Sequence, residues 1–168
     1  MSSIRVSGLV EESIVDGPGM RYVVFAQGCL HNCKGCHNPA THALDGGHLV
    51  DVNDIINDVK KNPLLKGITF SGGEPFLQAE AFTELAKKCH ELGLDVICYT
   101  GYTFEKLVSS FDEHSDWKLL LQNVDILIDG PFVETKKSLL LLFRGSSNQR
   151  ILDTVSSLQK MCPVAAKI

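Results

Sequence analysis

The sequence predicts an α/β protein in which βα units build an open, partial barrel around a mainly parallel sheet. Short apolar runs alternate along the chain with stretches in which apolar residues recur at helical spacing. The runs are continuous, as is typical of strands that a parallel sheet buries on both faces. Repeated βα units imply parallel strands with right-handed crossovers. About five such units fit the chain, too few for a closed barrel, which takes about 250 residues.

Four apolar runs are the expected strands, because they are rich in the β-branched and aromatic residues that favour extended chain. They cover residues 22–25, 68–70, 95–99 and 124–128. Loops and stretches with helical periodicity separate the runs, so we expect the carboxyl ends of the strands to meet on one side of the sheet.

Helices are expected between these strands. Asp51 is placed to cap the first helix, whose apolar residues are Ile55, Ile56 and Val59. The second helix ends at Gly93 and has one apolar face, made of Phe82, Leu85, Ala86, Cys89 and Leu92. Residues 104–111 predict a shorter helix. A last helix, ending before Pro163, is indicated by Ile151, Val155 and Leu158.

Composition limits the function classes. The chain has 168 residues, a net charge of −4 and no run of Lys and Arg, which argues against a nucleic-acid partner. We expect a single domain, 1–168, without a signal peptide or a membrane span, since the longest leucine run is far short of the ~20 residues needed. The expected location is the cytoplasm, where disulfides are rare and clustered cysteines indicate metal or redox chemistry.

Three of the six cysteines crowd one loop after the first strand, with the spacing C-x3-C-x2-C: Cys29, Cys33 and Cys36. They offer three thiolates and no obvious fourth ligand, whereas a structural zinc site has four ligands. A zinc site completed by His31 or His37 is one interpretation. A cubane cluster with one iron left free for a substrate is the other. The remaining cysteines, which are scattered, are interpreted as small core residues: Cys89, Cys98 and Cys162.

A second motif follows the next expected strand, where residues 71–75 read Ser-Gly-Gly-Glu-Pro. In a parallel sheet this loop and the cysteine loop open on the same side. Two glycines let backbone approach a ligand closely, and the carboxylate of Glu74 could receive an ammonium group. Taken alone, residues 72–75, Gly-Gly-Glu-Pro, would be an ordinary turn, but their place one βα unit after the cysteine loop favours a shared site.

With these two motifs the chain resembles the radical S-adenosylmethionine (SAM) family. Three further stretches, residues 15–21, 99–102 and 144–149, are similar to those of activating proteins for glycyl-radical enzymes. Within that branch the chain is most similar to the activators of anaerobic ribonucleoside-triphosphate reductase. The resemblance extends from about residue 4 to residue 153, nearly the whole chain.

The resemblance implies two cofactors, a [4Fe–4S] cluster and S-adenosyl-L-methionine. It implies that the cluster irons are bound by Cys29, Cys33 and Cys36, and that SAM chelates the fourth iron. The SAM-binding residues it implies are Gly35, Cys36, His37, Gly72, Gly73, Glu74 and Asp129. For Asp129, which would bind ribose or a cation, a solvated Asp-Gly turn is the alternative. No side chain is expected to act as acid or base, so nothing is catalytic beyond the cluster and SAM.

The implied reaction is reductive cleavage of SAM, followed by removal of a hydrogen atom from a backbone glycine of the reductase. A reduced flavodoxin would be the electron donor. Residues 16–21 and 144–149 are candidates for gripping the protein substrate, although the latter could instead begin a helix capped by Ser147 or Asn148. An activase for a formate-lyase type of enzyme is the main rival function. A zinc-binding interaction module is the rival from another class.

Overall fold

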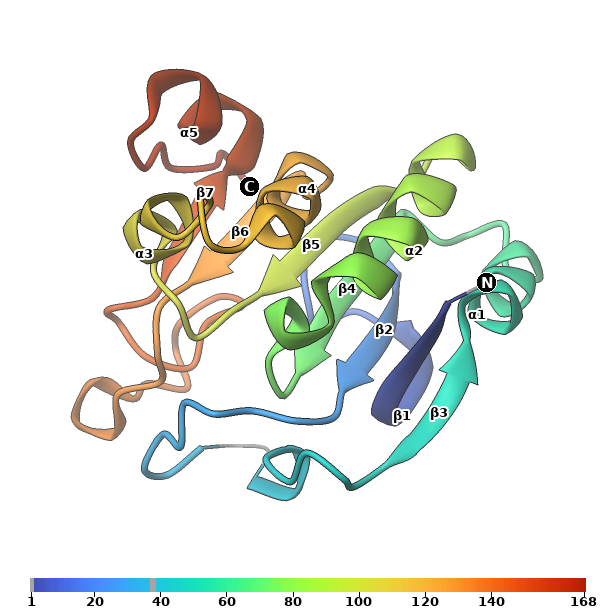
Figure 1. The fold of residues 1–168 in the computed structure, drawn as a ribbon, viewed down its shortest axis with the longest axis horizontal. Helices are drawn as coiled ribbons and strands as arrows, with labels where there is room; N and C mark the ends of the chain where they lie inside the picture. Colours follow the sequence, from blue (N-terminus) through green and yellow to red (C-terminus); the bar gives the residue numbers. More distant parts are fainter. Residues whose placement is uncertain (1, 37–38) are drawn as a thin grey trace.

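The computed structural model describes residues 2–36 and 39–168. In this part of the chain seven strands form one sheet, in the order β3-β1-β2-β4-β5-β6-β7 (Figure 1). The four central strands are parallel to one another and are the four that the sequence predicts: β2 (Arg21–Ala26), β4 (Gly67–Gly72), β5 (Asp95–Tyr99) and β6 (Ile126–Asp129). The outermost strands, β3 and β7, do not pair, so the α/β prediction of an open sheet with a parallel centre is confirmed.

Three antiparallel strands at the edges were not predicted. They are β1 (Ser3–Ser13), β3 (His48–Asp51) and β7 (Arg150–Asp153). Ile151 lies in β7 and not in the last helix, which corrects that prediction. The helix begins only at Thr154, because the side chain of Asp153 accepts a hydrogen bond from the Ser156 amide at 3.0 Å and so caps it.

Five helices occur in the described residues: α1 (Val52–Lys60), α2 (Ala79–Glu91), α3 (Phe104–Ser109), α4 (Ser115–Gln122) and α5 (Thr154–Lys160). Short 3-10 turns add η1 (Pro39–Thr41), η2 (Pro75–Gln78) and η3 (Glu134–Lys136). Asp51 caps α1 as predicted, since its carboxylate accepts from the Asn53 amide at 2.8 Å. The sequence analysis missed α4, which buries Trp117, Leu120 and Leu121.

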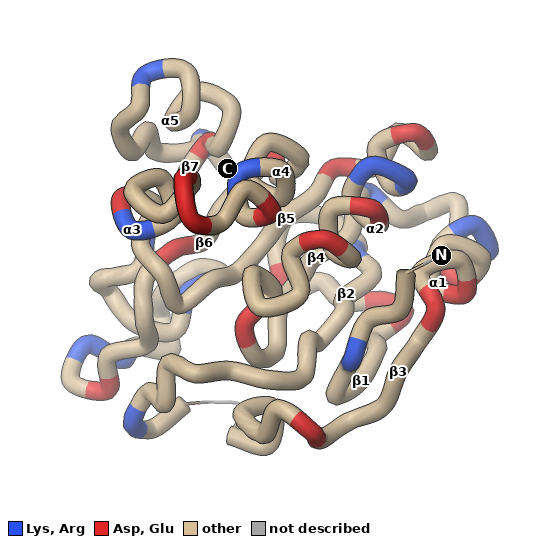
Figure 2. Tube along the Cα trace, in the orientation of Figure 1, with Lys and Arg blue, Asp and Glu red and all other residues tan. Residues whose placement is uncertain are grey.

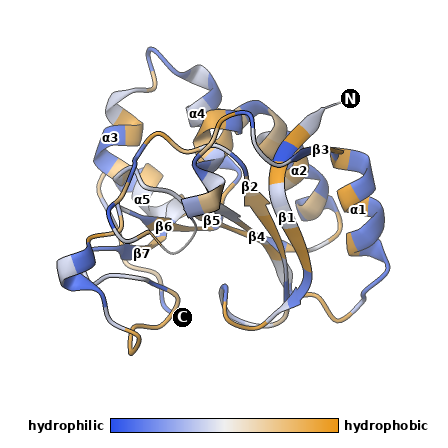
Figure 3. Cartoon of the chain, turned by 90° about the horizontal axis from the view of Figure 1, so that it is seen from below, coloured by the Kyte–Doolittle hydropathy of each residue, from blue (hydrophilic) through white to orange (hydrophobic). Residues whose placement is uncertain are grey.

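The two faces of the central strands are covered differently. On one face, side chains such as Phe70 and Val96 share a buried core with apolar residues of α1 to α4. On the other face Val23, Thr69 and Ile97 are also buried, and the loop after β1 lies over them. Figure 3 shows the hydrophobic colouring of these strands. Burial on both faces explains why the apolar runs in the sequence are continuous.

Arg21 pins this covering loop to the sheet. Its side chain is fully buried, donates from Nε to the Thr69 hydroxyl at 2.7 Å and pairs with Asp95 at 2.5 Å. It also donates to the carbonyls of Pro18 and Ile68, at 3.2 and 2.9 Å. The prediction that residues 16–21 grip a partner is therefore wrong for Arg21, because no part of its side chain reaches the surface.

Among the described residues, Lys and Arg do not gather in one part of the chain. Lys and Arg are dispersed along the chain, with Asp and Glu between them (Figure 2). None of the helices in the described part combines the length and the apolar character that a bilayer crossing demands.

Candidate functional site

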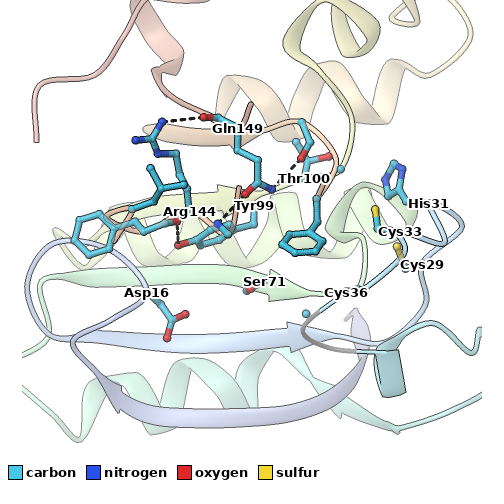
Figure 4. A pocket seen from close by; sticks show the side chains of 18 of the residues that line it. Asp16, Cys29, His31, Cys33, Cys36, Ser71, Tyr99, Thr100, Arg144 and Gln149 are labelled. Carbon is cyan, nitrogen blue, oxygen red and sulfur yellow. Dashed lines mark hydrogen bonds between the residues drawn. The ribbon is translucent and has the colours of Figure 1, made fainter. Parts of the chain in front are cut away.

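A cavity of about 340 Å³ opens where the central parallel strands end (Figure 4). It is lined by Ser71 and Gly72 at the end of β4, by Tyr99 at the end of β5, by Gly130 after β6 and by the cysteine loop. The volume lies in the range of small-molecule sites, about 300–1,000 Å³. The carboxyl edge of a parallel sheet is also where such folds bind ligands, so this cavity is the candidate site.

All three loop cysteines, Cys29, Cys33 and Cys36, line this cavity. The base of their loop is held by backbone bonds from Gly28 to the Thr41 carbonyl at 2.6 Å and from Cys29 to His42 at 3.2 Å. Burial raises the pKa of the Cys29 thiol, and hydrogen bonds from the backbone at residues 31 and 32 partly oppose this effect. The structure thus brings the three predicted ligands to one place.

Among the described residues, no three His, Cys, Asp or Glu side chains lie close enough together to hold one metal ion. In an iron–sulfur cluster each thiolate binds a different iron, so the sulfurs surround the cluster instead of one ion. Three soft thiolates that line one open cavity are a donor set that fits such a cluster.

The other cysteines have separate environments. Burial raises the pKa of Cys89 to about 12 and that of Cys98 well above its ordinary value, so both remain neutral thiols in the core, as predicted. Cys162 is exposed after α5, which makes the core prediction wrong for that residue. None of the three lines the cavity.

The glycine turn after β4 packs directly against the base of the cysteine loop. Gly72 has a φ of 87°, and a Cβ there would lie 2.5 Å from the Ala26 nitrogen. A Cβ on Gly73 would lie 2.4 Å from the Gly28 carbonyl oxygen. The Glu74 amide donates to that same oxygen at 2.8 Å. The two motifs are therefore hydrogen-bonded to each other, and only glycine lets their backbones approach this closely.

The Glu74 side chain differs from its sequence-based expectation. It is 1% exposed, and its Oε1 accepts from the Thr100 hydroxyl and the Gly101 amide, each at 2.8 Å. The ring nitrogen Nε2 of His31 lies 2.5 Å from the same oxygen, and Oε2 accepts from the Phe76 amide at 3.1 Å. The expected receiver of an ammonium group thus faces donors of its own chain and does not line the cavity.

Asp129 requires a correction, because it is neither solvated nor among the residues that line the cavity. Its carboxylate accepts from the Phe104 amide at 2.7 Å and from Nε of Arg150 at 3.0 Å. Arg150 also binds Glu105, and this contact lowers the pKa of Glu105. Asp129 joins β6, α3 and β7, so the predicted binding of ribose or a cation is replaced by a structural role.

Two further predicted residues lie away from the cavity lining or outside the described part. Gly35 is exposed, has a φ of 74° and packs beside Glu134 of η3. This positive φ favours glycine at the turn, whereas the Glu134 side chain, whose carboxyl carbon would lie 3.0 Å from a Cβ on Gly35, is flexible and could move. His37 falls outside the described residues.

A second wall of the cavity comes from the segment between β6 and β7. It includes Arg144, Gly145 and Gln149, and the Tyr99 hydroxyl donates to the Phe143 carbonyl at 2.7 Å. Residues 144–149 do not begin a helix, so that alternative is wrong; the Gln149 side chain instead accepts from the Gly145 amide at 2.9 Å. Sequence reasoning missed Phe132, Leu141 and Phe143, whose apolar type gave no sign of a site.

Exposed apolar side chains lie next to two of the lining residues in the sequence. Leu139 and Leu140 are 86% and 96% exposed, immediately before the lining residue Leu141. Ile14 and Val15 are 74% and 72% exposed, and Val15 also lines the cavity. Exposed apolar residues beside a cavity are typical of a surface that another molecule covers.

Comparison with known proteins agrees with this geometry. Residues 15–152 match the model of a family described as "4Fe-4S single cluster domain". The chain is 36% identical over 148 residues to an anaerobic ribonucleoside-triphosphate reductase-activating protein of Vibrio cholerae, covering 82% of this chain and 90% of that protein. The Escherichia coli K12 protein of the same name is 33% identical, covering 81% and 90%. A pyruvate formate-lyase-activating enzyme of Clostridium pasteurianum is 35% identical, covering 72% of this chain and 53% of that protein.

Proposed function

We propose the function of this chain from its family: it belongs to the anaerobic ribonucleoside-triphosphate reductase-activating proteins and contains a 4Fe–4S single-cluster domain. The chain is a radical SAM activase that generates a glycyl radical on anaerobic ribonucleoside-triphosphate reductase. The supporting observation is the hydrogen-bonded pair of motifs at one cavity, the cysteine loop and the Gly72–Gly73 turn.

The residues of the chain would divide the work as follows. Cys29, Cys33 and Cys36 would hold the [4Fe–4S] cluster at the cavity wall. Gly72 and Gly73 present backbone without side chains to the cavity, where the SAM amino group would bind. When bound, the cluster and SAM supply the one-electron chemistry that leads to removal of a hydrogen atom. The chain itself supplies position and a partly enclosed space, and needs no acid or base for this reaction.

The open form of the site suits a protein substrate. A backbone glycine can reach the cavity only if its loop enters a wide mouth, and the sheet remains open because β3 and β7 do not pair. The exposed apolar side chains beside the cavity, Ile14, Val15, Leu139 and Leu140, would contact that loop. The remaining parts of the proposal are a reduced flavodoxin as electron donor and a location in the cytoplasm.

Anaerobic mixing with the reductase tests the function directly. The reduced protein, incubated with SAM and the reductase, is expected to release 5′-deoxyadenosine and to produce a glycyl-radical signal in electron paramagnetic resonance. Mixtures that lack SAM or the chain serve as controls. A wild-type protein that holds iron and sulfide but yields no radical on the reductase would refute this choice of substrate.

The similarity to the C. pasteurianum enzyme supports a formate-lyase partner as the second candidate. The same assay with pyruvate formate-lyase in place of the reductase decides between the two. The reductase is favoured, because the reductase activators are matched over 90% of their length and the lyase activator over 53%. Metal analysis tests the zinc-binding interaction module. That module would be colourless and contain zinc, whereas an iron–sulfur protein is brown and contains iron and sulfide in equal amounts.

Arg144 is the expected contact with the protein substrate. It lines the cavity and donates to the Gln149 carbonyl at 3.0 Å, and its Nε is buried without a hydrogen-bond partner among the described residues. Arg144→Ala is expected to weaken the complex with the reductase by about tenfold, the effect of one lost charged hydrogen bond. Iron content should not change.

Calorimetric titration of the reductase measures this effect. Lys136→Ala removes an exposed cation of η3 outside the cavity lining and is the matched control, for which unchanged affinity is expected. Equal affinities of wild type and Arg144→Ala would show that the arginine does not contact the substrate.

A further inference from the structure

The ring of His31 lies between two strand ends beside the cysteine loop. Its Nε2 is 2.5 Å from Glu74 Oε1, and its side chain is 16% exposed. The ring meets the Tyr102 ring edge to face, with centroids 4.4 Å apart and an interplanar angle of 72°. It also presses on Gly101, where a Cβ would lie 2.5 Å from the ring atom Cδ2. The histidine therefore contacts three residues that follow β4 and β5.

We propose that His31 is a positioning residue, which fastens the cysteine loop to the ends of β4 and β5 and thereby holds Cys29 and Cys33 in place for the cluster. This inference rests on the proposed function, because it concerns the same site. The inference assigns a role to a position that the cysteine motif C-x3-C-x2-C leaves unspecified.

The way the loop is held explains why such a fastening matters. Its base is fixed through Gly28 and Cys29, which donate to the carbonyls of Thr41 and His42. Farther along, the Cys36 amide donates to the Cys33 carbonyl at 3.2 Å, a bond that joins the loop to itself. The His31 ring, by contrast, contacts the segments that follow β4 and β5. Loss of the ring would remove the contacts that residue 31 makes with Glu74, Gly101 and Tyr102, two positions before Cys33.

The backbone of the same residue faces the first sulfur. Backbone groups of His31 and Asn32 lie close enough to the Cys29 sulfur to lower the pKa of its thiol, against the larger effect of burial. Asn32 has a φ of 53°, so the chain turns sharply there. Hydrogen bonds to cluster sulfurs are among the factors that set the reduction potential. A ring held by Glu74 would therefore fix both the place of Cys29 and the N–H groups directed at it.

A substitution at His31 should leave the fold intact. Glu74 keeps three donors without the histidine, namely Thr100, Gly101 and Phe76, so its buried carboxylate is not left unpaired. His31→Ala can therefore be compared with wild type as a folded protein. His31→Gln retains an N–H donor at a similar distance from the backbone and is the conservative variant.

The experiment reconstitutes each variant anaerobically and measures iron and sulfide per chain, the resonance spectrum and the reduction potential of the cluster. We expect His31→Ala to hold iron about tenfold more weakly against a chelator, the usual cost of losing a residue that orients a ligand. Its spectrum and potential should shift, whereas His31→Gln should largely restore both. His48→Ala, at an exposed position of β3, is the matched control and should behave as wild type.

A second variant tests the contact without removing the histidine. Gly101 is not among the described glycines with positive φ, so alanine fits its backbone, but the new Cβ would displace the His31 ring. Gly101→Ala should reproduce the loss of iron, and in the His31→Ala background it should add little further loss.

Wild-type iron affinity, spectrum and potential in both single variants would overturn the inference. Additive losses in the double variant would also contradict it, because they would mean that Gly101 acts independently of His31. A wild-type protein that binds no cluster would instead refute the proposed function, so the two failures are distinguishable.

Discussion

Serine in place of Cys33 is expected to abolish cluster binding and every activity that depends on it. Cys33 is half-buried and lines the cavity between the other two cysteines in the sequence. A thiolate is the ligand of cluster iron, and a serine hydroxyl does not ionise at neutral pH to replace it. With three protein ligands and no obvious fourth, loss of one leaves only two. We expect iron below a tenth of the wild-type amount and no detectable 5′-deoxyadenosine.

The measurement is iron, sulfide and visible absorbance after anaerobic reconstitution, with thermal unfolding of the metal-free protein to show that the fold persists. Cys162→Ser is the matched control, because this cysteine is exposed and does not line the cavity, and it should bind a full cluster. A Cys33→Ser protein with wild-type iron and sulfide would contradict the assignment of Cys33 as a ligand.

Methionine in place of Arg21 is expected to give the largest loss of stability. The guanidinium is fully buried, and its removal takes donors away from the Thr69 hydroxyl, the carbonyls of Pro18 and Ile68, and Asp95. Removing one partner of a buried ion pair costs about 3–5 kcal/mol. Because Asp95 is 33% exposed and water can reach it, we expect the lower end of that range.

Urea unfolding of the metal-free protein measures this change as a lower midpoint at an unchanged slope. Lys61→Met is the control, because Lys61 is 78% exposed and its pairing with Asp58 at 3.5 Å is a surface contact worth about 0–1 kcal/mol. A change below about 1 kcal/mol in Arg21→Met would show that the methionine side chain replaces the arginine without cost.

The Arg21 variant should also affect the cavity. The Thr69 hydroxyl accepts a hydrogen bond from Arg21 and donates one to the Asp16 carbonyl at 2.8 Å. Because Asp16 lines the cavity, the arginine indirectly holds part of the cavity wall. Destabilisation and weaker retention of iron are therefore expected together, in contrast to His31→Ala, for which we expect weaker retention with a preserved unfolding midpoint.

The sequence predicted the parts of the fold that depend on strong local patterns. The four central strands are continuous apolar runs, and α1 and α2 carry complete apolar faces with a capping Asp51 and a terminal Gly93. It missed β3 and β7, which have four residues each, and α4, which has eight. Elements this short contain too few repeats for a period to be recognised, and contacts with neighbours stabilise them. It also missed β1, which has eleven residues, because the register of β1 against β2 shifts twice and its sequence shows no regular alternation.

Side chains with internal partners were the main source of error at the site. The types and order of residues gave no sign that Asp129 would meet Arg150, or that Glu74 would meet Thr100 and His31. These partners are separated by 21 to 43 residues in the chain, and they come together only where strands and loops end side by side. The presence of a carboxylate in a sequence motif therefore did not show whether that carboxylate binds a ligand or other residues of the protein.

The sequence by itself determined the parallel centre of the sheet, the spacing of the three cysteines and the place of both motifs after their strands, since each is a property of contiguous residues. Tertiary structure alone decided that Arg21 is buried, that Asp129 and Glu74 are held by the chain, and that His31 reaches the end of β5. The physical reason is that a polar side chain buried away from water is bound by whichever donors the fold brings within hydrogen-bond distance, and those donors are remote in sequence.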